Sequence, residues 1–187
     1  DRSYLLTIAS PAGWDKVRHL DIEALSEILD WINIMTYDFN GDWSAVSNFN
    51  APLYPSPEDP TINPGVNADA TVQRYLGRGV PSDKLVLGVP FYGRAVQGVP
   101  NVNGGLFQSY TGTPMGTWDD ATSGATGMFD YADIVLNYLG QPGIDAYREP
   151  DSGVPWLHEP SSGLFLSYDD PASLLLKKQY VQANGLG

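Results

Sequence analysis

The sequence contains no cysteine, and this absence excludes several kinds of chemistry. These residues can build no disulfide framework, no thiolate nucleophile and no cysteine-rich metal site. Histidine is also scarce, because only His19 and His158 occur and they lie far apart in the sequence. We therefore predict no metal site and no cofactor, and we interpret both histidines as surface or loop residues.

Positive charge is scarce as well. The chain has 10 Lys and Arg residues against 22 Asp and Glu residues, which gives a formal net charge of −12 at pH 7. Because such a surface repels phosphates, we exclude nucleic acid as a partner. The acidity fits a neutral ligand and a soluble, extracellular protein.

Segments that would send the chain to or across a membrane are absent too. No run of residues is long and apolar enough to span a bilayer, so we predict no membrane partner. Residues 1–4 carry neither the basic nor the apolar region of a signal peptide. The chain also begins without Met, and we therefore expect a processed or truncated product.

The composition that remains is that of a globular domain. Hydrophobic residues make up 42% and charged residues 17% of the 187 positions, a balance that separates this chain from disordered ones. The length suits one domain, or one domain with an insertion, and allows a sizeable core. The 15 prolines and 11 tyrosines predict many loops with aromatic lining.

Strand and helix patterns alternate over the first half of the chain. An apolar run at 4–9 predicts a buried strand, and apolar residues at helical spacing follow Asp21, which suits a helix N-cap. The next apolar run, 31–37, makes the order strand, helix, strand, which predicts a parallel pair with a right-handed crossover. After a long loop, a helix that begins near Asn67 and a strand at 84–90 continue the pattern.

The alternation stops after this strand. Glycines divide residues 95–157 into short pieces, yet the segment holds several aromatic residues and a helical pattern near 129–138, so we interpret it as a small α+β insertion domain. A strand at 163–168 and a helix capped by Asp170 return the chain to the first pattern. We therefore divide the chain into residues 1–94, 95–157 and 158–187.

Polar and aromatic side chains follow the apolar run at 31–37. Met35, Tyr37 and Asp38 stand at its end, and Trp43 comes after a turn. Taken singly, Tyr37 and Asp38 would only close a strand and begin a turn. Together, a phenol, a carboxylate and an indole at the carboxyl end of a barrel strand suit a sugar, which needs polar partners at its rim and a flat face to stack on.

The order Met-x-Tyr-Asp at a strand end resembles the sixth barrel strand of the family 18 glycoside hydrolases, the chitinase family. Four further segments resemble the same family in the same order. Residues 5–13 resemble its fifth strand, residues 84–94 its seventh strand, the glycine-rich segment with Trp118 its insertion domain, and residues 165–187 its approach to strand eight. The resemblance implies an α/β fold, a partial (β/α)8 TIM barrel of about strands 5 to 8 with a small α+β chitinase insertion domain.

The resemblance also implies a function, the hydrolysis of chitin or chito-oligosaccharides by a retaining mechanism that the substrate's own acetamido group assists. Tyr37 and Asp38 would be the catalytic residues of this chain. Tyr37 would donate a hydrogen bond to the acetamido group, and Asp38 would place negative charge beside the cationic intermediate. The expected substrate-binding residues are Met35 and Tyr92 as walls of the subsite, Arg94 on its hydroxyls or on a carboxylate, Trp43 as a stacking platform, and Trp118 and Trp156 in the insertion.

One motif of the family does not occur in these residues. The signature Asp-x-x-Asp-x-Asp-x-Glu, which supplies the general acid, is absent. Asp21-Ile-Glu23 is the most similar segment, but it lacks the preceding aspartates. We therefore predict that the chain alone is inactive and needs the amino-terminal half of the barrel. A non-catalytic sugar-binding lectin or inhibitor, and a fragment completed by another chain, remain as alternatives.

Strands predicted at 4–9, 31–37, 84–90 and 163–168 would leave both edges of a parallel sheet unpaired.

Overall fold

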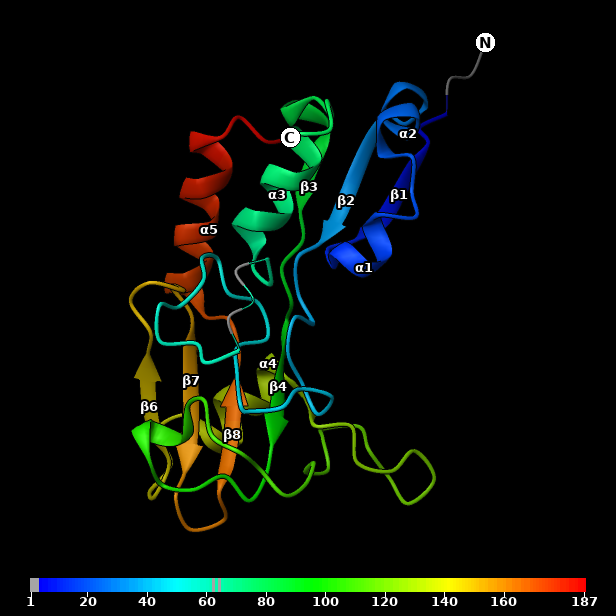
Figure 1. The fold of residues 1–187 in the computed structure, drawn as a ribbon. Coiled ribbons are helices and arrows are strands. Elements are labelled where there is room, and N and C mark those ends of the chain that lie inside the picture. Colours follow the sequence, from blue (N-terminus) through cyan, green and yellow to red (C-terminus); the bar gives the residue numbers. More distant parts are fainter. Residues whose placement is uncertain (1–3, 62, 64) are drawn as a thin grey trace.

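Two β-sheets follow one another along the molecule in the computed structural model, which describes residues 4–61, 63 and 65–187 (Figure 1). The first sheet is parallel, with the order β1-β2-β3, and the second is antiparallel, with the order β5-β4-β8-β7-β6. The strands are β1 Thr7–Pro11, β2 Trp31–Met35, β3 Leu85–Leu87, β4 Tyr92–Val96, β5 Met128–Asp130, β6 Asp145–Arg148, β7 Pro155–Glu159 and β8 Leu164–Ser167. The helices are α1 Trp14–Val17, α2 Ile22–Ile28, α3 Ala68–Leu76, α4 Tyr131–Asp133 and α5 Pro171–Ala183, with 3₁₀ turns at Ser82–Lys84 and Asn103–Gly105 and a π-helical turn at Ile134–Tyr138.

The first strand pair forms as the sequence pattern predicts. β1 pairs with β2 in parallel register, with Thr7 opposite Trp31, and α2 connects them after Asp21, whose carboxylate caps the helix. Figure 1 shows α3 and α5 next to each other, and the Tyr180 hydroxyl donates to Asp69 Oδ1 at 2.7 Å between these helices. The predicted strand, helix, strand unit with parallel pairing is therefore confirmed.

The core of this half lies between the parallel sheet and the helices. Ile32 and Ile34 of β2 and Leu85 of β3 are fully buried, and they belong to one cluster with Val72 and Tyr75 of α3. Burial of such side chains contributes about 1.5–3 kcal/mol each. Within the described residues, no helix is long and apolar enough to cross a bilayer.

The last predicted strand belongs to the other sheet. The sequence pattern predicts that residues 163–168 continue the parallel sheet, but β8 runs antiparallel to both β4 and β7. This prediction is wrong because a short apolar strand carries no mark of its direction. Leu164, Phe165 and Leu166 are buried and would suit a strand of either sheet. The described part of the chain therefore holds three parallel strands.

The antiparallel sheet is larger than the predicted insertion domain. Strands β4 and β7 run across the boundaries expected at 94/95 and 157/158, so the sheet extends from Tyr92 to Ser167. The residues directly after the predicted strand at 84–90 therefore begin a new strand, β4, which belongs to the antiparallel sheet. The helical pattern near 129–138 yields only the short α4 and a π-helical turn, because β5 pairs with β4 before them.

The two histidines have different environments. His19 is exposed after α1, as predicted. The same prediction is wrong for His158, which lies in β7 and is fully buried. Burial lowers the pKa of the His158 imidazole, so the ring is neutral near pH 7.

Candidate active site

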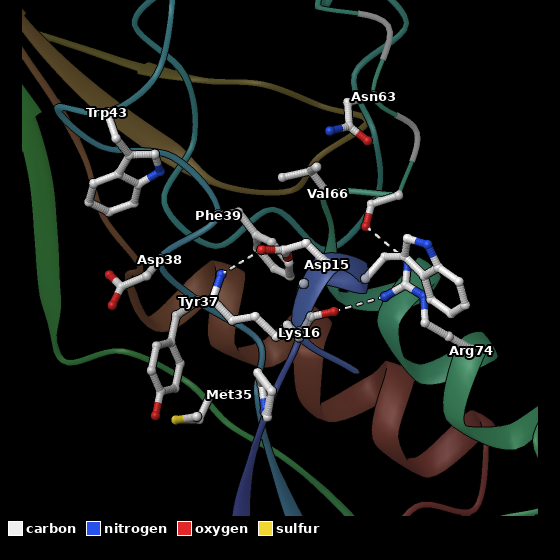
Figure 2. A pocket seen from close by; sticks show the side chains of 15 residues that line it. Asp15, Lys16, Met35, Tyr37, Asp38, Phe39, Trp43, Asn63, Val66 and Arg74 are labelled. Carbon is white, nitrogen blue, oxygen red and sulfur yellow. Dashed lines mark hydrogen bonds and ion pairs between the residues drawn. The ribbon is translucent and has the colours of Figure 1, made fainter. Parts of the chain in front are cut away.

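A pocket of about 620 Å³ opens at the carboxyl ends of β1 and β2 (Figure 2). Met35, the last residue of β2, lines it together with Tyr37, Asp38 and Trp43, which follow that strand. Residues of α1 and Arg74 of α3 line the pocket as well. The structure thus brings four of the predicted site residues to one cavity.

Successive side chains at the end of β2 point alternately into the core and into the pocket. This alternation places the predicted site residues in the pocket. Ile34 and Thr36 are buried, whereas Met35 and Tyr37 are half-buried and line the pocket. Thr36 Oγ1 donates to the carbonyl of Gly88 at 2.6 Å. This hydrogen bond joins the residues after β2 to the residues after β3, beyond the last paired residues of the two strands. A Cβ at Gly88 would lie 2.6 Å from the Ile34 carbonyl and 3.0 Å from the Tyr37 ring, so this approach requires glycine.

Asp38 has a left-handed backbone with φ of 56°, a conformation that Asp and Asn adopt more readily than other non-glycine residues. The Asn50 side chain accepts from Asp38 N at 3.0 Å, and the Asn50 main-chain carbonyl accepts from Phe39 N at 3.0 Å. Asn50 N in turn donates to Ser167 Oγ at 3.0 Å, and Asn50 Nδ2 donates to the Tyr92 carbonyl at 3.4 Å. The turn that carries Asp38 is therefore fixed to β4 and β8.

The carboxylate of Asp38 receives two donors from β4. The Tyr92 hydroxyl donates to Oδ1 at 2.8 Å, and Arg94 Nε donates to the same oxygen at 2.9 Å. The Asp38 side chain is 38% exposed and that of Arg94 13%, so the carboxylate remains accessible from the pocket while its partner is largely covered. The Tyr37 ring stands edge to face with Tyr92, with ring centres 6.2 Å apart.

Each partner of Asp38 stays in one protonation state. Burial raises the pKa of the Tyr92 phenol, and the hydrogen bond and negative charge of Asp38 raise it further. Burial alone would lower the pKa of the Arg94 guanidinium, but the hydrogen bond and charge of Asp38 raise it above its ordinary value. Tyr92 and Arg94 therefore both donate to Asp38 throughout the neutral pH range.

Trp43 supplies an exposed aromatic surface at this end of the pocket. Its side chain is 55% exposed, and the Arg94 guanidinium lies 5.2 Å from the centre of its ring. A Cβ at Gly41 would lie 2.6 Å from the same ring, so the ring position requires glycine there. An exposed indole beside a carboxylate–guanidinium pair suits a neutral ligand that has an apolar face and hydroxyl groups. Among residues 4–61, 63 and 65–187, no three His, Asp or Glu side chains form a group that could hold a metal ion.

The comparison with protein families agrees with this geometry. The model of the glycosyl hydrolases family 18 matches residues 1–187. The chain belongs to family 18. It is 41% identical to Chitinase A1 of Niallia circulans over 100% of this chain and 26% of that protein. The resemblance seen in the Met-x-Tyr-Asp motif is therefore confirmed.

Solved structures of chitinases have the same fold. A chitinase of Bacillus thuringiensis matches with a TM-score of 0.93 and 44% identity, over 98% of this chain and 30% of that chain. Catalytic domain 2 of the Ostrinia furnacalis Group II chitinase, solved in complex with an (NAG)5 oligosaccharide, matches with a TM-score of 0.86 and 30% identity, over 98% of this chain and 46% of that chain. The family 18 chain described here thus spans less than half the length of these relatives.

Four residues predicted to bind sugar in this family 18 chain do not line the pocket, namely Tyr92, Arg94, Trp118 and Trp156. Tyr92 and Arg94 instead donate to Asp38, which does line it. Trp156 is only 6% exposed, its ring stacks on Tyr147 at 5.1 Å, and its Nε1 donates to the Gly104 carbonyl at 2.8 Å. It is buried in the antiparallel sheet, outside the pocket lining, and its assignment as a sugar contact stays a prediction. Trp118 is 79% exposed, and its Nε1 donates to Asp130 Oδ2 at 2.7 Å, which fixes the ring at the surface.

Asn50 is a positioning residue of the family 18 site that the sequence pattern does not reveal. Its side-chain and main-chain partners Asp38, Tyr92 and Ser167 lie 12, 42 and 117 residues away along the chain, so no local spacing marks it. The one available signal is its place in a long loop between regular elements, where functional residues often gather.

Replacement of Asn50 by Ala is expected to destabilise the protein by about 1–3 kcal/mol, because it removes the acceptor of Asp38 N and the donor to the Tyr92 carbonyl. Asn50 is only 1% exposed, so water does not easily replace its side chain. The control is Asn137→Ala, an exposed site whose amide contacts Asp133, with an expected change within about 0.5 kcal/mol. Urea denaturation measures both, and an unchanged midpoint for Asn50→Ala would contradict the positioning role.

Proposed function

We propose that this chain carries the acetamido-binding side of a chitinase active site, which hydrolyses β-1,4-linked polymers of N-acetylglucosamine. The observation that carries this proposal is the cluster in which Asp38 accepts from Tyr92 and Arg94 beside the ring of Tyr37. Relatives named as chitinases, one of them solved with (NAG)5, support chitin or chito-oligosaccharides as the partner. Because chitin is an extracellular polymer, the proposal includes an extracellular location.

The proposed reaction uses the acetamido group of the substrate itself. The acetamido carbonyl oxygen attacks the anomeric carbon, the glycosidic bond breaks, and an oxazolinium ion forms on the sugar. A Glu outside these residues gives its proton to the leaving oxygen. The Glu then takes a proton back from a water molecule whose oxygen attacks the anomeric carbon, and the bond from that carbon to the acetamido oxygen breaks, so the acetamido group is restored and the configuration is retained. Tyr37 holds the acetamido group in line, and Asp38 places negative charge beside the cation. Met35 and Tyr92 wall the subsite, and Arg94 fixes Asp38.

We also propose that the active form is a (β/α)8 barrel completed by an amino-terminal half. β1 and β3 are the edge strands of the parallel sheet. Apolar side chains next to these edges are exposed, with Tyr4, Leu5 and Leu6 at 80%, 69% and 54% before β1 and Phe91 at 71% after β3. Parallel sheets normally have both faces covered and their edges protected, so these exposed side chains support a partner segment that pairs with the edges.

Sugar binding without hydrolysis, as in a lectin or an inhibitor, is the second candidate function. The observation that favours it is the absence of the Asp-x-x-Asp-x-Asp-x-Glu motif from the 187 residues. A binder would use the same pocket, with Trp43 and Asp38 in the same places. The intact mass of the protein and the coding sequence upstream of Asp1 decide between the two, because only the enzyme requires the Glu.

Replacement of Trp43 by Ala is expected to weaken the binding of chito-oligosaccharides by about 1–3 kcal/mol, which is the loss typical of an aromatic anchor. Folding should remain intact because the ring is 55% exposed. Calorimetric titration of the protein in which the acid Glu is replaced by Gln measures the affinity without hydrolysis, and Trp118→Ala in the same protein provides the comparison with an exposed indole outside the pocket. A large fall in thermal stability with unchanged affinity would mean that Trp43 is a structural residue.

A further inference from the structure

Trp43 lies in a tight turn outside the regular strands and helices. Ser44 N donates to the Gly41 carbonyl at 3.0 Å and closes this turn, so Trp43 is the third of its four residues. The ring is 55% exposed, and Figure 2 shows it near Asp38 at one side of the pocket. Because few side chains cover the ring, its place depends on what holds the main chain of residues 41–44.

The hydroxyl of Tyr110 lies against three carbonyls of this turn. It donates to the Asp42 carbonyl at 2.8 Å and to the Ser44 carbonyl, and the Gly41 carbonyl lies 3.5 Å away. A phenol has one proton, which these carbonyls share. Gly41 and Asp42 precede Trp43 and Ser44 follows it, so Tyr110 contacts the main chain on both sides of the indole.

Tyr110 is suited to hold these carbonyls because its hydroxyl keeps its proton. Burial raises the pKa of the Tyr110 phenol, and the negative charge of Asp42 raises it further. The ring of Tyr110 packs against the buried cluster that includes Val96 and Trp156. Loss of the hydroxyl alone therefore removes the donor and leaves the packing of the ring in place.

A separate group of contacts fixes the base of the same loop. Ser47 N donates to the Gln108 carbonyl at 2.9 Å, and Phe107 N donates to the Ser47 carbonyl at 3.0 Å. Ser47 Oγ donates to the Gly105 carbonyl and accepts from Gln108 N at 2.9 Å. The base is therefore held without Tyr110, and the Tyr110 hydroxyl acts on the turn at residues 41–44.

We propose that Tyr110 is a positioning residue for Trp43, whose hydroxyl holds the turn at residues 41–44 so that the indole stays in place for a sugar ring. This inference rests on the proposed function, because it takes Trp43 to stack on an oligosaccharide. Tyr110 does not line the pocket, so loss of its hydroxyl removes no sugar contact there. A preorganised ring loses less entropy on binding than a mobile one, and Tyr110 acts through this difference.

Calorimetric titration with chitohexaose tests this role in the complete protein with its acid Glu replaced by Gln. Tyr110→Phe is expected to weaken binding about threefold to tenfold, the effect of one hydrogen bond. The control Tyr138→Phe removes a hydroxyl from another half-buried tyrosine, which packs on Phe129 outside the pocket, and should leave the affinity unchanged. Wild-type affinity for Tyr110→Phe, with Trp43→Ala still weakened, would overturn the inference and leave the proposed function standing.

A double variant separates positioning of the indole from a general effect on the fold. Trp43→Ala leaves no indole to position, so the further change Tyr110→Phe should alter the affinity less than about twofold. An equal loss with and without Trp43 would show that Tyr110 acts on the fold, and it would overturn the proposal. Wild-type affinity for Trp43→Ala would instead reject the stacking role on which the inference rests.

Fluorine NMR gives a measurement that needs no sugar. The protein is labelled with 5-fluorotryptophan, and the signal lost in Trp43→Phe identifies Trp43. Tyr110→Phe is expected to shift or broaden this signal and to leave that of Trp118, which its bond to Asp130 fixes, unchanged. The same Trp43 signal in the wild type and Tyr110→Phe would overturn the positioning role, whether or not the protein binds sugar.

Discussion

The purified 187-residue chain is expected to hydrolyse chito-oligosaccharides at no measurable rate. In the proposed mechanism Tyr37 and Asp38 position an acetamido group, but the motif that would supply a proton to the leaving oxygen does not occur in these residues. General-acid assistance is typically worth about 10²–10⁴ in rate. The unpaired edges of the parallel sheet add a second deficit, because exposed apolar strand residues promote association.

Addition of the amino-terminal half of the barrel, with its Glu, is expected to restore both turnover and solubility. A chito-oligosaccharide hydrolysis assay compares the chain alone, the two halves together, and the two halves with that Glu replaced by Gln. The Gln variant restores assembly without the acid and so separates folding from chemistry. Robust hydrolysis by the chain alone would contradict this account and would point to another acid among its own carboxylates.

Replacement of Lys177 by Met is expected to destabilise the protein by about 3–5 kcal/mol. Lys177 Nζ lies 2.8 Å and 2.6 Å from the two carboxylate oxygens of Asp169, and the two side chains are only 2% and 1% exposed. Loss of the ammonium group leaves the Asp169 carboxylate as an unpaired charge in the interior. The pair joins α5 to the residues that follow β8.

Two further variants test whether the predicted loss comes from burial of an unpaired charge. Lys16→Met removes the pair with Asp15, whose side chains are 67% and 68% exposed, and solvent screening should leave the denaturation midpoint unchanged. The double variant Lys177→Met with Asp169→Leu should recover most of the lost stability, because it leaves no charge unpaired. Urea denaturation measures all three. A midpoint for Lys177→Met equal to that of the wild type would refute the expected cost of leaving the Asp169 carboxylate unpaired.

Elements of the parallel half could be predicted from the sequence because their signals are local. Asp170 followed by Pro171 predicts the start of α5, and the structure has a capping box at that position. Asp21 marks the start of α2 in the same way. The motif from Met35 to Asp38 also lies within a few residues, so the sequence places these side chains at one strand end before the sheet is known.

Features that depend on distant partners could not be predicted. Trp43 and Trp156 are both indoles near strands, but Trp156 alone is buried, by distant partners that include Tyr147, Phe49 and the Gly104 carbonyl. The direction of β8 depends on its pairing with β4 and β7 and not on its own apolar residues. Asn50 reaches its three partners only after the two sheets have come together.

Arg94 touches both parts of the proposed subsite, since it donates to Asp38 at 2.9 Å and lies 5.2 Å from the ring centre of Trp43. Groups that share one partner do not contribute independently to binding. The free-energy changes caused by replacing Asp38 and Trp43 are therefore not additive. The difference between the double variant and the sum of the single ones is a direct measure of the coupling between the Asp38 carboxylate and the Trp43 indole in the proposed subsite, with Arg94 as the physical link.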